Sequence, residues 1–314
     1  MYKGAINKYF GNLKTGIQLA NIAFNNESDA YKRKQRSKTL MYFFTRSKLT
    51  NYWLDKLNDE ALRDVFKCRP RLFMKPYRPY LSTRWNKYKV IQVIIDNYDF
   101  LRKKGLMSWV GPEIKTICDF SLKDGIDARI EIGYHEKFRK EGELVVQFIC
   151  EELGGVISVA SFSFEHEAGI WNCRIGCIQG NNELPAEKMK LAQKLMHGLR
   201  PKVLMIFVIQ QICNVLQVDH LYGSGDSIQA HKKKHAIHIP WVHKIGFKYD
   251  EIWKEEGGVQ NDEGWFEIPI FPKRKSVAEM KVHKRAYYMK RYELEKNIAE
   301  GIESSLSQKD IKSQ

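Results

Sequence analysis

Four short runs in which apolar and polar residues alternate follow one another in the middle of the chain, and no other feature restricts its fold as much. Alternation with period two is typical of strands that bury one face, and short turns between successive strands make neighbours antiparallel. Glycines separate the runs, at Gly142, Gly154-Gly155 and Gly169. The sequence therefore predicts an antiparallel meander of four strands, over residues 128–134, 143–150, 156–164 and 171–179.

Two helices and a strand are predicted after the meander. Residues 184–196 form a helix that Gly198 ends, and Pro201 begins an almost entirely apolar helix over 201–216. The next strand, over 218–222, is then parallel to the last strand of the meander, because helices connect the two. Two final strands are expected over 247–253 and 265–270. We therefore expect an α+β fold with a mixed, mainly antiparallel sheet and one β-α-β crossover.

The region before the meander is predicted to be helical. Apolar residues recur three and four positions apart over 47–66 and 85–101. Pro70, Pro76 and Pro79 predict an extended segment between these helices, because proline disfavours helix at itself and at the preceding residue. We expect three regions in all: a basic, mainly helical region over 1–120, an α+β core over 121–272, and a basic helix with a tail over 273–314.

The net charge restricts the partners. The chain has 52 Lys and Arg against 37 Asp and Glu, a formal charge of +15. No acidic residue lies between Asp29 and Asp55 or between Asp64 and Asp96, so much of the excess is concentrated in the first hundred residues. Such a field favours anionic partners, which include nucleic acid, acidic lipid, nucleotide phosphate and an acidic carrier protein.

The sequence also predicts a cytoplasmic location. Residues 1–17 contain three lysines and no apolar core, unlike a secretory signal. The longest apolar run, 203–209, is far shorter than the roughly 20 residues that cross a bilayer. The six cysteines include no CxxC pair, so we expect reduced, mostly buried thiols rather than disulfides or a zinc site.

The segment 197–202, His-Gly-Leu-Arg-Pro-Lys, has the strongest local chemistry. A proline at the first helical position leaves backbone N–H groups at the positive end of the helix dipole, where basic side chains add charge. The alternative is an ordinary solvated helix start. The hypothesis is a phosphate site that the end of the preceding strand completes, formed by Gln179, Gly180, Lys194, His197, Gly198, Arg200, Pro201 and Lys202.

Several side chains are candidates for acid–base chemistry. We favour His220 and Ser224, because they follow the crossover and are expected at the carboxyl edge of the sheet, where ligands commonly bind. The other candidates are Glu165, His166, Glu167 and Asp226. No metal is predicted: a helix would place His231, His235 and His238 on one face, but we interpret that segment, with its lysines, as a basic surface.

Five segments resemble the VirK/YbjX family of Gram-negative bacteria, and the resemblance covers nearly the whole chain. The most specific are Ile-Gly-Cys-Ile-Gln-Gly at 175–180 and His-Gly-Leu-Arg-Pro-Lys at 197–202. The others are Glu-Gly-Glu-Leu at 141–144, Tyr-Asp-Glu-Ile-Trp at 249–253, and Lys-Arg-Ala at 284–286 near Arg291-Tyr292. The resemblance implies a cytoplasmic bacterial protein associated with virulence, envelope integrity and resistance to antimicrobial peptides.

The order of elements also resembles the GNAT acyltransferase fold, and Lys-Ile-Gly-Phe-Lys at 244–248 is similar to its last part. This resemblance implies an acyl-CoA or acyl-carrier thioester as cofactor. Its pantetheine arm would lie between the strands that end at Gln179 and Tyr222, with its pyrophosphate near Pro201. One departure is the insert 180–199, which replaces a short glycine-rich turn.

Three functions follow from these observations. The first is a possible acyltransferase that uses acyl-CoA or an acyl carrier and acts in envelope modification or antimicrobial-peptide resistance. In it the basic clusters of the first hundred residues would dock an acidic carrier or the anionic inner membrane. The second is a non-enzymatic accessory factor that binds anionic membrane or a partner protein. The third is nucleic-acid binding, which the interleaved aromatic and basic residues suggest but no known motif supports.

Overall fold

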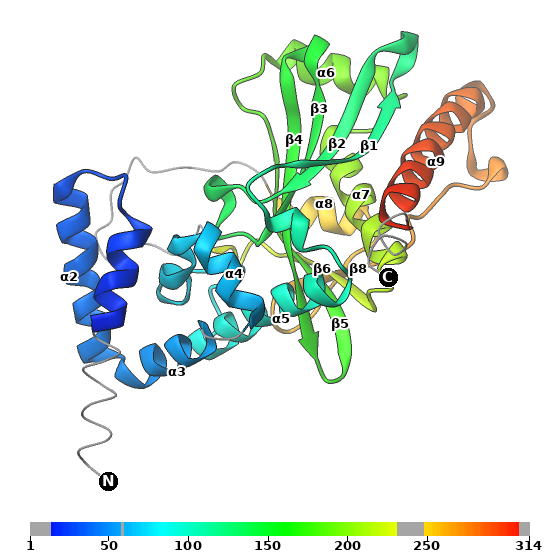
Figure 1. Ribbon diagram of the computed structural model, residues 1–314. Coiled ribbons are helices and arrows are strands. Elements are labelled where there is room, and N and C mark those ends of the chain that lie inside the picture. The colour runs from blue at the N-terminus through cyan, green and yellow to red at the C-terminus, as the bar shows by residue number, and fades with distance from the viewer. Residues whose placement is uncertain (1–13, 58–59, 231–247, 308–314) are drawn as a thin grey trace.

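The computed structural model describes residues 14–57, 60–230 and 248–307. Its centre is a mixed sheet of eight strands in the order β1-β2-β3-β4-β5-β6-β8-β7 (Figure 1). The first five form an antiparallel meander, β6 is parallel to β5, and β8 is antiparallel to β6 and β7. The bounds are β1 (Lys115–Ser121), β2 (Asp127–Gly133), β3 (Leu144–Cys150), β4 (Gly155–Glu167), β5 (Ile170–Gly180), β6 (His220–Ser224), β7 (Val259–Gln260) and β8 (Trp265–Ile268). The predicted α+β class, with its mainly antiparallel sheet and crossover, is confirmed.

The crossover consists of two helices. After β5 the chain forms α6 (Ala186–Leu195), turns at Gly198, and continues as α7 (Pro201–Val215), as the glycine and proline predicted. All but four residues of α7 are buried, and the helix packs on β3, β4 and β5. The C-terminal helix α9 (Arg285–Ser307) packs against α7 and β1, where Gly301 lies against the Cys118 side chain. These two helices bury the apolar surface of the meander.

The N-terminal helices attach to the sheet through α5 (Lys87–Lys103), which runs against the end of β4. Beyond Phe162 the outer edge of β4 has no β3 partner. There the Asn97 side chain of α5 accepts a hydrogen bond from the Phe164 N–H at 3.0 Å, and Asp96 accepts one from the His166 N–H at 3.1 Å. Before α5 the chain forms α2 (Asp29–Thr45), α3 (Ser47–Leu57), α4 (Glu60–Cys68) and the 3-10 helix η1 (Pro70–Tyr77).

Two predicted elements are wrong. The proline segment is not extended but forms η1, because the φ angle that proline fixes also suits a 3-10 helix and Pro70 begins it. The predicted strand 247–253 is instead α8 (Tyr249–Glu255). Tyr249, Ile252 and Trp253 are buried, and their spacing of three and four residues places them on one helical face.

Other predictions are modified in detail. The C-terminal helix begins at Arg285 rather than at 273, after two 3-10 turns. The histidines from 231 to 243 lie outside the described residues, and the described part of the chain contains no cluster that could hold a metal. All six cysteines are free; Cys68 is exposed and the other five are buried. Within the same residues no helix has the length and hydropathy needed to cross a membrane.

Candidate functional site

The parallel strands β5 and β6 stop pairing halfway along β5, at a place that we call the parting. They pair from Asn172 and His220 to Ile175 and Gly223, after which β6 ends while β5 continues to Gly180. The parting coincides with a β-bulge, because Ser161 of β4 faces Cys177 and Phe162 faces Ile175, which leaves Gly176 as the extra residue. Residues 176–180 therefore have no β6 partner on the side where the crossover helix begins.

Helix α8 fills the inner part of this parting with aromatic side chains. The Tyr249 hydroxyl donates to the Ile178 carbonyl of β5 at 3.1 Å, and the Trp253 indole donates to the Ser224 carbonyl of β6 at 3.0 Å. The Trp253 ring also packs so closely on Gly223 that an added Cβ would lie 2.5 Å from it. Two side chains thus supply hydrogen bonds where the two strands no longer pair.

A pocket of about 420 Å³ lies at the mouth of the parting, between α6, the start of α7 and α8. Four of its lining residues are cations and two are acids, while Met189 and Ile252 add apolar surface. The charged members are Lys190, Arg200, Lys202, Lys248, Glu251 and Glu255. The pocket therefore combines positive charge with an apolar wall.

The start of α7 makes this pocket suitable for an anion. Pro201 is the first helical residue, Arg200 makes no side-chain capping hydrogen bond, and the first turn contains no acid. Burial, and then the charge of Arg200, lowers the pKa of the Lys202 ammonium. Arg200 Nη2 lies 2.5 Å from Glu255 Oε2 in a half-exposed pair. Because such exposed pairs contribute little, an anionic ligand can replace Glu255 at Arg200.

The structure divides the predicted phosphate residues into two groups. Arg200, Pro201 and Lys202 line the pocket, and Gly180 lies beside it, since an added Cβ would be 3.7 Å from the Lys202 side chain. His197 and Gly198 instead face Tyr287 of α9, where the His197 and Tyr287 rings lie 6.0 Å apart. Lys194 is exposed on α6, and Gln179 is partly buried near the end of β5.

A buried carboxyl group, which the sequence analysis did not propose as a site residue, lies next to the bulge at Gly176. Glu141, in the loop before β3, is only 8% exposed, and its backbone packs against the Gly176 bulge. Burial raises the pKa of Glu141 to about 7. Its charge in turn contributes to the raised pKa values of Tyr249 and Cys177. In the sequence, the segment of Glu141 stands out only through the family resemblance.

We expect Glu141→Gln to stabilise the protein at alkaline pH. The pKa of Glu141 rises from 4.5 to about 7 on folding, so its contribution to stability is complete below pH 4.5 and is lost as the pH rises through 7. Glutamine mimics the protonated form at every pH. The variant should therefore be more stable than wild type by about 2–3 kcal/mol at about pH 8, and nearly equal near pH 4.5, in urea unfolding. A difference that does not change with pH would contradict this interpretation.

The structure does not bring the two favoured acid–base residues together. His220 begins β6 and so lies at the amino end of the strand, not at the carboxyl edge where it was expected; its Nδ1 lies 2.8 Å from Glu267 Oε1. Ser224 is at the carboxyl end, where it was expected, and is fully buried. In an extended strand these positions are about 13 Å apart, so one reacting group cannot contact both. Asp226, beyond the strand, exchanges hydrogen bonds with Asp250 at the start of α8.

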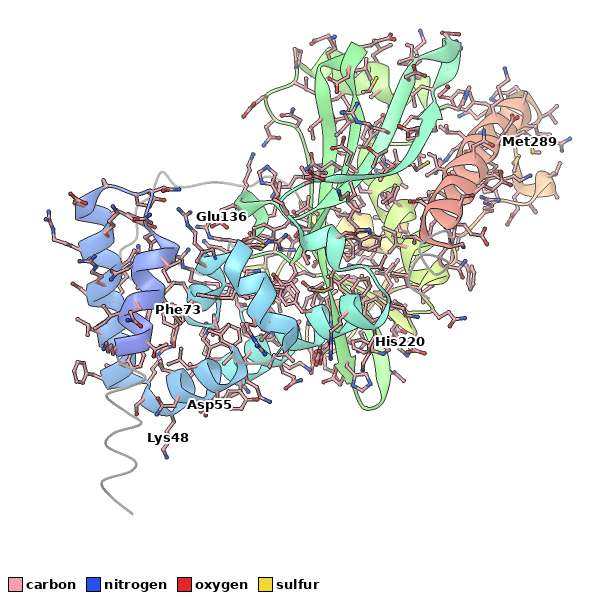
Figure 2. All side chains as sticks on the ribbon, viewed as in Figure 1. Lys48, Asp55, Phe73, Glu136, His220 and Met289 are labelled. Carbon is pink, nitrogen blue, oxygen red and sulfur yellow. The ribbon has the colours of Figure 1, made fainter. Side chains whose placement is uncertain are left out.

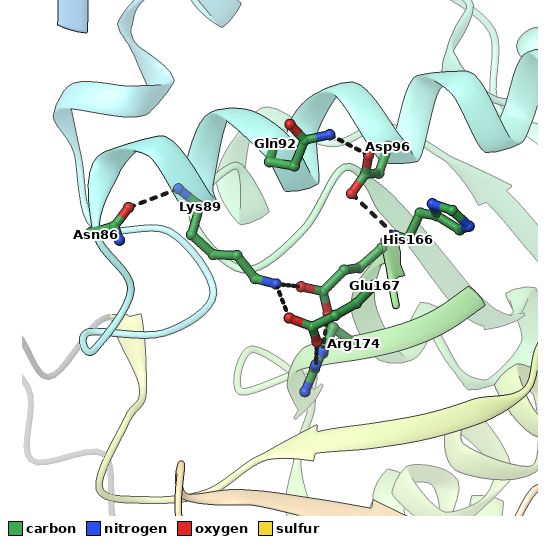
Figure 3. Close-up of polar contacts among 8 residues, drawn as sticks. Asn86, Lys89, Gln92, Asp96, His166, Glu167 and Arg174 are labelled. Atoms are coloured by element: carbon green, nitrogen blue, oxygen red, sulfur yellow. Dashed lines mark hydrogen bonds and ion pairs between the residues drawn. The ribbon is translucent and has the colours of Figure 1, made fainter. Parts of the chain in front are cut away.

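Glu165 and Glu167 belong to a network of charges at the end of β4 (Figure 3). Arg174 of β5 contacts Glu165 at 2.6 Å and Glu167 at 3.5 Å, and Lys89 of α5 pairs with both carboxylates. The Arg174 guanidinium also lies over the Tyr222 ring at 4.2 Å. Two cations balance two carboxylates here, so the network holds α5 on the sheet and leaves neither carboxylate available as a base.

The chain has relatives in other bacteria. A family model described as "Protein of unknown function (DUF535)" matches residues 28–304. The protein named YbjX of Escherichia coli is 25% identical over 270 residues, which cover 84% of this chain and 81% of that protein. A protein of Haemophilus influenzae is 32% identical over 234 residues, 72% of this chain and 73% of its own.

One solved structure shows a weaker likeness. It is a mutant form of a cAMP-binding acyltransferase from Mycobacterium smegmatis, with 11% identity, a TM-score of 0.30 and coverage of 72% of this chain and 63% of its own. A likeness of that size does not establish a shared fold.

Proposed function

The chain belongs to the DUF535 family, which is the VirK/YbjX family that its motifs resemble, and from this premise we propose that it binds an acyl thioester carried by coenzyme A or an acyl carrier and transfers the acyl group. In this proposal the acceptor is an amine or hydroxyl of the bacterial envelope, because the family resemblance implies a role in envelope integrity. The observation that carries the proposal is the parting of β5 and β6 beside the basic start of α7.

The pocket provides each part that the thioester's carrier arm requires. Arg200, Lys202 and the start of α7 would hold the phosphate groups. The pantetheine chain would follow the apolar wall of Met189 and Ile252 toward the unpaired side of residues 176–180. There the pantetheine chain meets Tyr249. An amide N–H of the pantetheine would replace the Tyr249 hydroxyl as the donor to the Ile178 carbonyl.

We assign proton transfer to Glu141, which does not line the pocket and which the acceptor would reach only when Tyr249 gives up its hydrogen bond to Ile178. In the reaction the acceptor nitrogen or oxygen attacks the thioester carbon, the C–S bond breaks, and the thiolate leaves and takes a proton from water. The acceptor must lose a proton as the new bond forms, and a carboxylate with a pKa of about 7 can take it near neutral pH. The roles of His220 and Ser224 stay predictions; of the two, Ser224 lies at the parting.

We expect the double variant Arg200→Ala, Lys202→Ala to lose affinity for acyl-CoA on the order of 100-fold, because each charge-assisted contact to phosphate contributes about 1.5–3 kcal/mol. Titration calorimetry measures this loss of affinity. Lys194→Ala is the matched control, since this lysine is exposed and does not line the pocket. Glu255→Gln should bind more tightly than wild type, because it frees Arg200.

Two results would count against the proposal. One is a wild-type protein that binds no acyl-CoA and no acyl carrier; the other is equal binding by the double variant. Pantetheine without the nucleotide provides a further check, because its weak binding should not depend on Arg200 or Lys202. Binding without turnover of the thioester would favour the accessory factor.

A further inference from the structure

Between β8 and α9 the chain forms a projecting segment, residues 271–290, which we call the basic arm. It contains the 3-10 turns η7 (Val277–Glu279) and η8 (Val282–Lys284) and the first turns of α9. Figure 1 shows its orange part standing away from the sheet at the outer end of α9.

The basic arm has a fixed conformation. The Ser276 N–H and hydroxyl both donate to Glu279, at 2.7 and 2.9 Å, in a capping box around η7. Met280 is 4% exposed and anchors the arm, and the Lys275 N–H donates to the Tyr292 hydroxyl at 3.0 Å. The backbone of this segment is therefore held in place.

Four large apolar side chains of the basic arm are exposed to solvent. Their exposed fractions are 69% for Phe271, 56% for Val277, 75% for Val282 and 54% for Met289. Met289 points outward from α9 in Figure 2. Phe271 lines a pocket together with His220 and Ile270, whereas the other three lie on the projecting turns and the start of α9, where they can enter another medium.

The same segment is strongly basic. It contains Lys273, Arg274, Lys275, Lys281, Lys284, Arg285 and Lys290, against one acid, Glu279. Glu279 is used in the capping box, and Arg274 contacts Glu295 at 3.6 Å. Among the described residues no carboxylate pairs with Lys281, Lys284, Arg285 or Lys290. The apolar tips are thus surrounded by uncompensated positive charge.

We propose that the basic arm docks the protein on an anionic lipid surface. Lysine and arginine are attracted to acidic headgroups, while exposed aliphatic and aromatic side chains enter the boundary between headgroups and acyl chains. Nucleic acid would use the charges and the exposed Phe271 ring but not the aliphatic side chains, because valine and methionine do not stack on bases as aromatic rings do. Of these two partners, the lipid surface is the one that uses the basic charge together with the exposed aliphatic side chains of the arm.

Docking through the basic arm would also position the pocket at α7. Tyr287 at the base of the arm packs on Gly198, in the turn that leads to Pro201. The Lys273 side chain packs on Gly257, next to Glu256, which Arg200 contacts at 3.9 Å. The mouth of the pocket and the arm therefore adjoin. The inference does not rest on the proposed acyl transfer.

Vesicle flotation of the full chain tests the proposal. The probe is phosphatidylcholine with about 30% phosphatidylglycerol, compared with pure phosphatidylcholine, at about 0.1 and 0.5 M salt. Wild type should bind the anionic vesicles only, and less at high salt. Each basic residue near such a surface contributes a factor of about five, so the quadruple variant Lys281→Gln, Lys284→Gln, Arg285→Gln, Lys290→Gln should lose on the order of 500-fold. Val277→Ser with Val282→Ser should lose about tenfold and keep its salt dependence.

The matched control removes four exposed charges from the N-terminal region, where the sequence predicted the docking surface: Arg33→Gln, Lys34→Gln, Lys38→Gln and Lys48→Gln. It should bind within about threefold of wild type. The proposal is overturned if wild type does not bind the anionic vesicles, if the arm variant binds as well as wild type, or if only the N-terminal variant loses binding. If the Val277→Ser, Val282→Ser variant loses no binding to the anionic vesicles, and the wild-type protein binds DNA as well as it binds the vesicles, the arm is assigned to nucleic acid instead. All changes are at exposed positions, and equal circular dichroism spectra verify the fold.

Discussion

Gly176→Ala is expected to lower the free energy of unfolding by about 4 kcal/mol, at the upper end for a single methyl group. A Cβ at this position would lie 1.9 Å from the Glu141 carbonyl oxygen and 2.7 Å from its carbon. The neighbouring loop cannot easily move, because the Lys140 carbonyl accepts from Leu81 N–H at 2.8 Å and Glu141 N–H donates to Phe138 at 2.8 Å. Urea unfolding at neutral pH measures the loss.

Gly180→Ala is the control for this prediction. It lies four residues further along the same strand, where the nearest atom to an added Cβ is the flexible end of Met189, at 3.2 Å. We expect a loss below about 1 kcal/mol, because that side chain can shift. Equal losses of stability in the two variants would contradict the close approach of the bulge to the Glu141 loop. They would also contradict the geometry of the candidate site, which depends on that approach.

Lys75→Met is expected to cost about 3–5 kcal/mol, because it leaves a buried carboxylate without its cation. Lys75 of η1 is 5% exposed and pairs with Glu143, which is fully buried at the start of β3. The Tyr98 hydroxyl of α5 donates to the other carboxylate oxygen at 2.6 Å. This pair connects the N-terminal helices to the sheet, so its loss should destabilise the whole fold in thermal or urea unfolding.

Two variants make the interpretation specific. The same substitution in an exposed pair, Lys248→Met beside Glu251, should not change the stability measurably, since both side chains are more than half exposed. Combining Lys75→Met with Glu143→Gln should recover at least about 1 kcal/mol, because the unpaired charge is then removed. If the double variant were as unstable as the sum of the single ones, the loss would come from packing rather than from the charge.

The meander and the crossover could be predicted because their signals are local. A strand with one buried face alternates along a few residues, and a glycine or proline limits a helix by its own allowed φ angles. β1 was missed because its alternation is interrupted by an irregularity between Thr116 and Cys118. Residues 249–253 were predicted as a strand because their aromatic and β-branched content suits both states, and only their contacts with β6 and β8 select the helix.

The candidate site was only partly predictable, because only some of its residues are neighbours in sequence. Arg200, Pro201 and Lys202 adjoin in sequence and could be recognised together, and they line one pocket. Glu141 lies more than thirty residues from Cys177 and a hundred from Tyr249, and nothing near it in sequence indicates that these groups meet. Its raised pKa comes from burial, which depends on how distant segments pack.

The sequence alone determined the segments that form β2 to β6 and β8, which helices connect β5 to β6 as parallel strands, and where positive charge meets a helix start, because each depends on residues within one or two turns. Only the tertiary structure decided that α8 occupies the space between the parted strands, that His220 and Ser224 lie at opposite ends of β6, and that the Glu141 carboxyl group is buried. These outcomes depend on which distant surfaces exclude water from one another, and burial of that kind is a property of the packed molecule rather than of any segment.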